Sequence, residues 1–185
     1  MIITADHGES FGEHLNVFGH GTSLYQTQLH VPLVVIPPGR DTSPGVVSQT
    51  VSLRDLAATI VDILNLKTGA PFPGESLARS WSPAATAGGW PSSPALSEFV
   101  LTDLVSPDTT ASLANRQAWA SLAERDWIYI RGEGNAQEEL FDMREDVAEI
   151  HNHAQDPSMH SLLERMRGKL DRMTAGPLTR DRFKP

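Results

Sequence analysis

Residues 1–21, MIITADHGESFGEHLNVFGHG, place a short apolar segment directly before a polar loop. The segment 1–4 is typical of the end of a strand that is buried on both faces of a parallel sheet. Ligand sites in open α/β sheets lie beyond the carboxyl ends of the strands. The loop after this strand carries His7, His14, His20, Asp6, Glu9 and Glu13. The stretch therefore predicts an α/β fold with a polar site at its first strand end.

The next segments continue this pattern. Residues 31–36 predict a second apolar strand, which Pro37, Pro38 and Gly39 end. Residues 52–66 predict a helix that Ser52 caps, with Asp55 in the first turn and one apolar stripe. Residues 69–94 are rich in Gly, Pro, Ser and Ala and predict a long loop.

The second half of the chain predicts a smaller antiparallel structure. Residues 95–101 favour a strand, and residues 126–131 and 138–142 favour the two arms of a hairpin. Residues 157–173 carry apolar side chains at helical spacing and predict a C-terminal amphipathic helix, with a frayed tail from residue 175. The order of the elements indicates an α/β fold with a small antiparallel annex.

Composition limits the function. The chain has 185 residues and a net charge of −8, which argues against a nucleic-acid partner. The absence of Cys excludes disulfides, thiolate metal sites and a cysteine nucleophile within these residues. We expect no membrane span, because no apolar run reaches ~18 residues. Asp6 and His7 interrupt any signal-peptide core, so we expect a soluble chain without an export signal in these residues. Its location is left open, cytoplasmic for these residues alone or periplasmic for a longer protein.

The polar loop allows three interpretations. Asp6 and His7 would offer one carboxylate oxygen and one imidazole to a metal ion at the strand end, and His20 would return between Gly19 and Gly21. A zinc centre made by His7, His14 and His20 with Asp6 is an alternative, although the spacing matches no H-E-x-x-H helix. A solvated loop without a site is the third interpretation.

Other candidate features have simpler explanations. Gly74–Ala78 approaches G-x-S-x-G, but the last position is Ala and no apolar strand precedes it, so Ser76 is interpreted as a turn serine. Trp119 and Trp127 are expected to pack in the core or hairpin. The remaining histidines before the last helix, expected to be solvated, are His151, His153 and His160.

Several segments together resemble the C-terminal half of a sulfatase, a member of the alkaline phosphatase superfamily. They are ITADHGE (3–9), GEH (12–14), GHGTSLY (19–25), HVPLVV (30–35), PG (38–39), VSLRDLAATI (51–60), PGESL (73–77) and ELFD (139–142), followed by Asp146, Glu149 and Asn152. The resemblance covers residues 1–77 in order and spacing, and the hairpin more loosely.

The resemblance implies the C-terminal part of an alkaline-phosphatase-like, mostly parallel sheet with flanking helices, plus a small antiparallel sheet and a terminal helix. It divides the chain into part of the catalytic domain, 1–94, and a small C-terminal subdomain, 95–185. It implies sulfate-ester hydrolysis through a formylglycine made from Cys or Ser, with a divalent metal, Ca²⁺ first and Mn²⁺ or Zn²⁺ as alternatives. Asp6 and His7 would be metal ligands.

His20 falls where many relatives carry a Lys that contacts the sulfate, so it is the candidate catalytic residue. The resemblance gives no role to His14, Glu9 or Glu13. The family's nucleophile motif, C/S-x-P-x-R, does not occur in these 185 residues.

We therefore expect the missing N-terminal part of the same enzyme as a partner, a small sulfate or phosphate ester as substrate, and an inactive chain in isolation. A phosphate or phosphonate ester hydrolase and a non-catalytic fragment are the alternatives.

Overall fold

The computed structural model describes residues 1–14, 18–38, 45–66, 72–81, 93–101, 117–135 and 137–175. The chain forms two compact units, one made of Met1–Asp6 with Pro32–Ala95 and the other of His7–Val31 with Leu96–Pro185. The family domains expected at 1–94 and 95–185 stay a prediction, because compact units of one chain need not coincide with the domains of a family. Most of the expected loop 69–94 and the tail after residue 175 lie outside the described residues.

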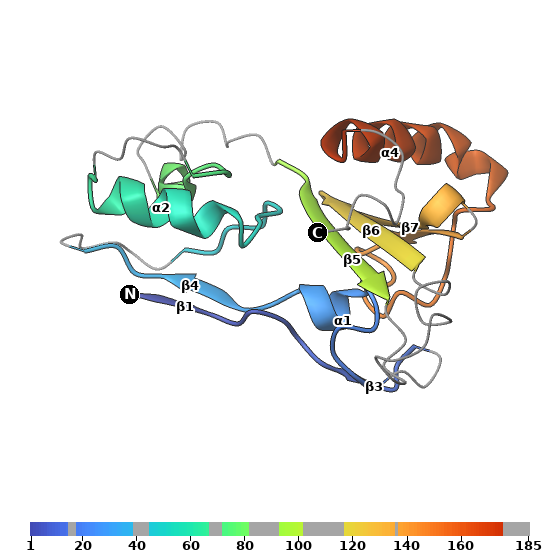
Figure 1. Ribbon diagram of the computed structural model, residues 1–185, viewed down its shortest axis with the longest axis horizontal. Coiled ribbons are helices and arrows are strands. Elements are labelled where there is room, and N and C mark those ends of the chain that lie inside the picture. The colour runs from blue at the N-terminus through green and yellow to red at the C-terminus, as the bar shows by residue number, and fades with distance from the viewer. Residues whose placement is uncertain are drawn as a thin grey trace, which may run out of the picture. The chain divides into compact units, whose positions relative to one another are not determined.

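The first unit contains a two-stranded ribbon. Strands β1 (Ile2–Thr4) and β4 (Leu33–Val35) pair antiparallel, with Ile3 opposite Val34 (Figure 1). Both strands were expected from the sequence, but as strands buried on both faces. Ile3 is 50% and Val34 49% exposed, because these two strands make a sheet by themselves in the described structure.

Helix α2 (Asp55–Ile63) is shorter than the predicted 52–66 and packs against the 3₁₀ helix η1 (Leu77–Trp81). Its buried positions are polar. The carboxylate of Asp55 accepts from the backbone N–H of Glu75, and the hydroxyl of Thr59 accepts from the N–H of Leu77. The expected apolar stripe remains partly exposed, because the segment that docks on the helix bonds to its polar side.

The second unit is built on a four-stranded sheet in the order β5-β6-β7-β8. Strand β5 (Ala95–Leu101) was predicted with these bounds. The predicted hairpin is confirmed, since β7 (Trp127–Gly132) and β8 (Glu138–Asp142) pair antiparallel across the short helix η3 (Glu133–Asn135). Strand β6 (Gln117–Glu124) was missed, because two of the buried residues on its core face are the small Ala118 and Ala120, which give a weak apolar signal.

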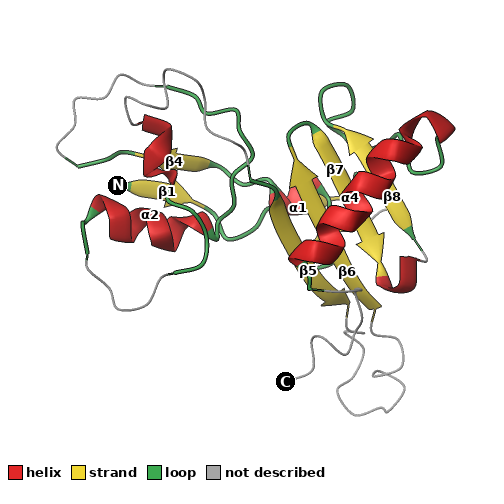
Figure 2. Ribbon diagram, turned by 90° about the horizontal axis from the view of Figure 1, so that it is seen from above, coloured by secondary structure: helices red, strands yellow, loops and turns green. Residues whose placement is uncertain are grey.

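Helix α4 (His160–Met173) follows the 3₁₀ turn η4 (Pro157–Met159), which confirms the predicted C-terminal helix. The helix lies across the sheet (Figure 2). It buries Leu163, Met166 and Leu170, which lie three and four residues apart and so share one face. These side chains pack on a core of Ala118, Ala120, Leu122, Tyr129 and Leu140.

The opposite face of the sheet carries the first part of this unit. Ile128 and Ile130 alternate with Tyr129 along β7, so they point to the other face, where they pack with Leu24 and Phe141. Two partly buried side chains also pack on this cluster. Tyr25 directly precedes the short helix α1 (Gln26–Leu29), and Leu29 is its last residue. The segment after the first strand is thus attached to the C-terminal sheet. No helix among the described residues is long and apolar enough to cross a membrane.

Candidate active site

The polar loop folds into a small hairpin. Strands β2 (Ser10–Phe11) and β3 (Phe18–Gly19) pair antiparallel, with Ser10 opposite Gly19. Glu9 immediately precedes β2 and His20 immediately follows β3, so this pairing brings the two side chains together. The segment thus has a defined hairpin structure, while the interpretation as a solvated loop without a site stays a prediction.

His7, Glu9 and His20 form one cluster, with one ligand atom of each within 4.8 Å of the others. The rings of His7 and His20 stack with their centroids 4.1 Å apart. The Nδ1 of His20 lies 3.1 Å from a carboxylate oxygen of Glu9, and the Nδ1 of His7 donates to the carbonyl of Gly8 at 2.8 Å. An imidazole that donates a hydrogen bond from Nδ1 has Nε2 as the atom that can bind a metal ion or accept a proton.

Gln28 connects the β2–β3 hairpin to the segments on either side of it. Its side chain is 3% exposed, and its Nε2 donates to the hydroxyls of Ser10 and Thr22, both at 2.9 Å. The backbone carbonyl of Gln28 accepts from the N–H of Gly8 at 2.8 Å. A Cβ at Gly8 would lie 2.1 Å from the carbonyl oxygen of Thr27, so only glycine allows the chain to approach α1 this closely.

His14 lies in a different environment. Its ring stacks on Tyr25 with centroids 3.8 Å apart, and its Nε2 lies 3.9 Å from a carboxylate oxygen of Glu149. Among the described residues, the cluster that could hold a metal includes His7 and His20 and leaves His14 out. The alternative zinc centre that included His14 is therefore not the arrangement that the structure shows.

Asp6 is exposed and directly precedes His7 in the chain. Its role as a metal ligand stays a prediction. Glu9 was present in the loop but had no role in the sequence interpretation, and the signal that would have found it is the hairpin pairing of residues 10 and 19. Gln28 gave no sequence signal, because a single Gln in a polar segment is indistinguishable from a surface residue.

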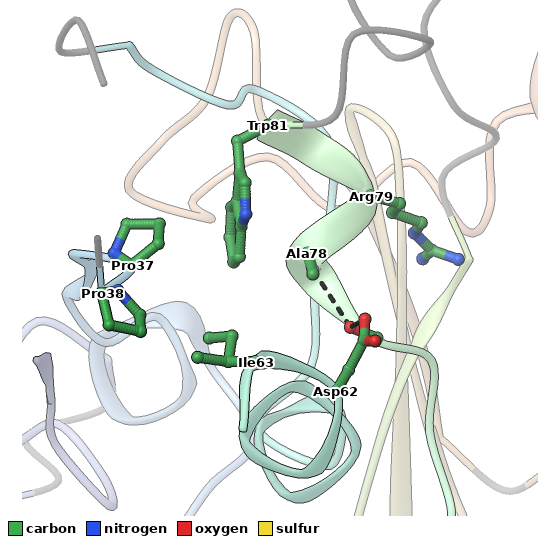
Figure 3. Close-up of a pocket in the computed structure, with 8 residues that line it drawn as sticks. Pro37, Pro38, Asp62, Ile63, Ala78, Arg79 and Trp81 are labelled. Carbon is green, nitrogen blue, oxygen red and sulfur yellow. Dashed lines mark hydrogen bonds between the residues drawn. The ribbon is translucent and has the colours of Figure 1, made fainter. Parts of the chain in front are cut away.

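The features elsewhere in the chain have structural roles. Ser76 donates to the carboxylate of Asp62 at 2.6 Å and accepts from the N–H of Ala78, as expected of a turn serine. A hollow of about 440 Å³ in the first unit is lined mainly by Pro37, Pro38, Asp62, Ile63, Ala78, Arg79 and Trp81 (Figure 3). None of the predicted site residues lines it.

Comparison with known proteins supports the resemblance found in the sequence. Residues 1–66, which contain the whole hairpin and both ribbon strands, match the model of the Sulfatase family. The match covers 66 of the 185 residues, and over these residues the chain is similar to sulfatases. The resemblance found in the sequence is thereby confirmed.

Curated sulfatases are also similar to this chain. Arylsulfatase K of Bos taurus is 37% identical over 82 residues, which are 44% of this chain and 15% of the relative. Delta 4,5-hexuronate-2-O-sulfatase of Bacteroides thetaiotaomicron is 27% identical over 173 residues, which are 92% of this chain and 34% of the relative. The chain thus spans about a third or less of the length of these sulfatases.

Solved structures confirm the fold class. A 2-O GAG sulfatase is 24% identical and superposes with a TM-score of 0.71 over 94% of this chain and 35% of its own. The phosphonate monoester hydrolase of Agrobacterium radiobacter is 23% identical, with a TM-score of 0.68 over 100% of this chain and 39% of its own. At these identities the likeness shows the fold alone, and that fold is the α/β class predicted from the sequence.

Proposed function

We propose that this sulfatase-family chain contributes one side of a divalent-metal site for sulfate-ester hydrolysis. The observation that supports the proposal is the cluster of His7, Glu9 and His20, which lies inside the segment that matches the family. Asp6 and His7 are the proposed metal ligands, and His20 is the proposed catalytic residue. Glu9 is a further candidate for either role.

The donor set fits a divalent cation. The Nδ1 of His7 donates to the Gly8 carbonyl, so Nε2 is the atom that would bind a metal ion, and ligating histidines commonly have this second hydrogen bond. Carboxylates such as those of Asp6 and Glu9 suit Ca²⁺ or Mn²⁺, whereas imidazole suits Zn²⁺. A bound divalent ion would polarise the ester oxygens as a Lewis acid.

His20 is proposed to act on the leaving group. Its Nδ1 is engaged by Glu9, so its Nε2 can carry the proton that passes to the departing alkoxide. The nearby carboxylate would stabilise the imidazolium before that transfer, in the same way that a carboxylate orients the base in other hydrolases. Glu9 therefore has a definite task even where it does not touch the metal ion.

The rest of the machinery is proposed to come from a further segment of a longer protein. The relatives are about three times as long as this chain or longer, and the 185 residues contain no Cys and no C/S-x-P-x-R motif. Met1, Ile3, Val34 and Ile36 lie on one face of the β1–β4 ribbon and are about half exposed or more, which fits a face that another layer of a longer protein covers. We expect the chain alone to bind metal weakly and to turn over no ester.

Metal binding tests the site directly. Calorimetric titration of the chain with Mn²⁺, Zn²⁺ and Ca²⁺ should detect binding of at least one ion. His7→Ala should weaken it by about tenfold or more, as loss of a metal-site contact does. His160→Ala, at an exposed histidine at the start of α4, is the matched control and should leave the affinity unchanged. Binding that His7→Ala leaves intact would contradict the assignment.

Activity tests the reaction class. The longer protein that carries this segment should hydrolyse an aryl sulfate, and His20→Ala should lower kcat more for substrates with poor leaving groups than for activated ones, because His20 supplies a proton to the alkoxide. The same enzyme is assayed on an aryl phosphonate. Faster turnover of the phosphonate would replace the sulfatase proposal by the phosphonate-hydrolase alternative.

A further inference from the structure

Four side chains form a polar network beneath the β2–β3 hairpin, and the proposed chemistry uses none of them. His14 stacks on Tyr25 and lies beside Glu149, and the hydroxyl of Tyr25 is hydrogen bonded to Glu139 of β8. The backbone N–H of Gln26, the first residue of α1, donates to Glu149 at 2.7 Å. The network thus joins the segment that carries the site to the C-terminal sheet.

Glu149 occupies a costly position. It is 3% exposed and adopts a φ of 53°, in the left-handed region that non-glycine residues rarely enter. Among the described residues, its second carboxylate oxygen is buried without a hydrogen-bond partner. Strain and burial of this kind persist only where the surroundings determine the conformation, and they cluster at functional sites.

The loop around Glu149 is itself braced. The carboxylate of Asp146 accepts from the backbone N–H groups of Ile150 and His151, and the side chain of Asn152 bonds to the backbone of Leu140 and Glu138 in β8. These bonds fix the backbone on both sides of Glu149. Its carboxylate is therefore presented to α1 from a rigid support.

A continuous chain of contacts leads from Glu149 to the proposed site. Glu149 holds the first turn of α1, and α1 carries Gln28 two residues later. The backbone carbonyl of Gln28 accepts from the N–H of Gly8, the residue after His7. Its side chain donates to Ser10 of β2 and to Thr22, two residues after His20. On the other side, Glu149 contacts His14, which lies in the loop between β2 and β3.

We propose that Glu149 is a positioning residue for the site, because it fixes both α1 and His14 and thereby holds His7, Glu9 and His20 in one cluster. The inference rests on the proposed function only in taking His7 and His20 as site residues. It assigns a task to the C-terminal sheet, whose face opposite α4 would support the β2–β3 hairpin.

The test observes the imidazole signals of the full chain by NMR, with no need for turnover. In Glu149→Ala we expect the His7 and His20 ring signals to shift and the ring-to-ring nuclear Overhauser effect of the stacked pair to disappear. Glu149→Gln keeps a side-chain oxygen that accepts from Gln26, so it should retain both. If Glu149→Ala does not fold, His14→Gln removes the ring that stacks on Tyr25 and should give the same loss.

Glu138→Gln is the control for general destabilisation of the subdomain, because Glu138 is nearly buried and pairs with Arg167 of α4. It should lower the melting temperature and leave the His7 and His20 signals unchanged. The proposal is overturned if Glu149→Ala preserves the stacked pair, or if Glu138→Gln disrupts it equally. A chain that binds no metal but loses the stacked pair in Glu149→Ala would sink the proposed function and leave this inference standing.

Discussion

The pH dependence of stability offers a sharp test of the buried network around Glu149. The pKa of Glu149 is raised from 4.5 to about 7, mainly by burial. The hydrogen bond from the Gln26 N–H lowers this pKa, whereas the nearby carboxylates of Glu139 and Asp146 contribute to raising it. The imidazole of His14 faces Glu149, with its Nε2 3.9 Å from a carboxylate oxygen. The perturbation is Glu149→Gln, which removes the titration and keeps the shape of the side chain.

The sign follows from proton linkage. Because the pKa is higher in the folded state, the folded protein binds more protons than the unfolded chain between pH 4.5 and 7, so the free energy of unfolding falls as the pH rises through this window. At ~1.4 kcal/mol per unit, the shift corresponds to about 3 kcal/mol. Above pH 7 the wild type is destabilised by this amount relative to a chain that keeps Glu149 neutral.

Urea unfolding of wild type and Glu149→Gln, followed by NMR signals of the β6–β8 sheet, measures the difference from pH 5 to pH 8. We expect the free energy of unfolding of the variant to rise relative to the wild type by about 2–3 kcal/mol across this range. The comparison cancels the titration of groups that both proteins share. A difference independent of pH would refute the reasoning, because it would mean that the Glu149 carboxyl titrates alike in both states.

Two further predictions concern packing. Gly8→Ala should destabilise the second unit by about 1–3 kcal/mol or more, because its Cβ would meet the carbonyl oxygen of Thr27, and urea unfolding measures the loss. Gly45→Ala, where a Cβ meets nothing within 4 Å, is its control. Leu140→Ala should cost about 2–5 kcal/mol, since Leu140 is 0% exposed, whereas Val147→Ala at a 73% exposed position should leave the melting temperature nearly unchanged. Equal effects of the two changes would contradict the assigned core.

Much of the fold followed from local pattern. The terminal helix was predictable because apolar residues recur at helical spacing over 157–173, and the hairpin because two strand-like runs flank a Gly-containing turn. The strand β6 escaped notice since it buries mainly alanines, whose small side chains give little contrast with polar neighbours. The pairing of β1 with β4 as an antiparallel, half-exposed ribbon was also beyond local pattern, because strand direction depends on the chain between the strands.

The sequence by itself indicated the resemblance to sulfatases and the candidate residues Asp6, His7 and His20, because the serial motifs from Asp6 to His20 lie close together along the chain. Only the tertiary structure decided which of the three histidines His7, His14 and His20 lie together in the cluster. His7 and His20 meet because β2 pairs with β3, whereas His14 turns towards Glu149, which is more than a hundred residues away in sequence. No local periodicity can encode such a contact, since it depends on the packing of α1 against the C-terminal sheet.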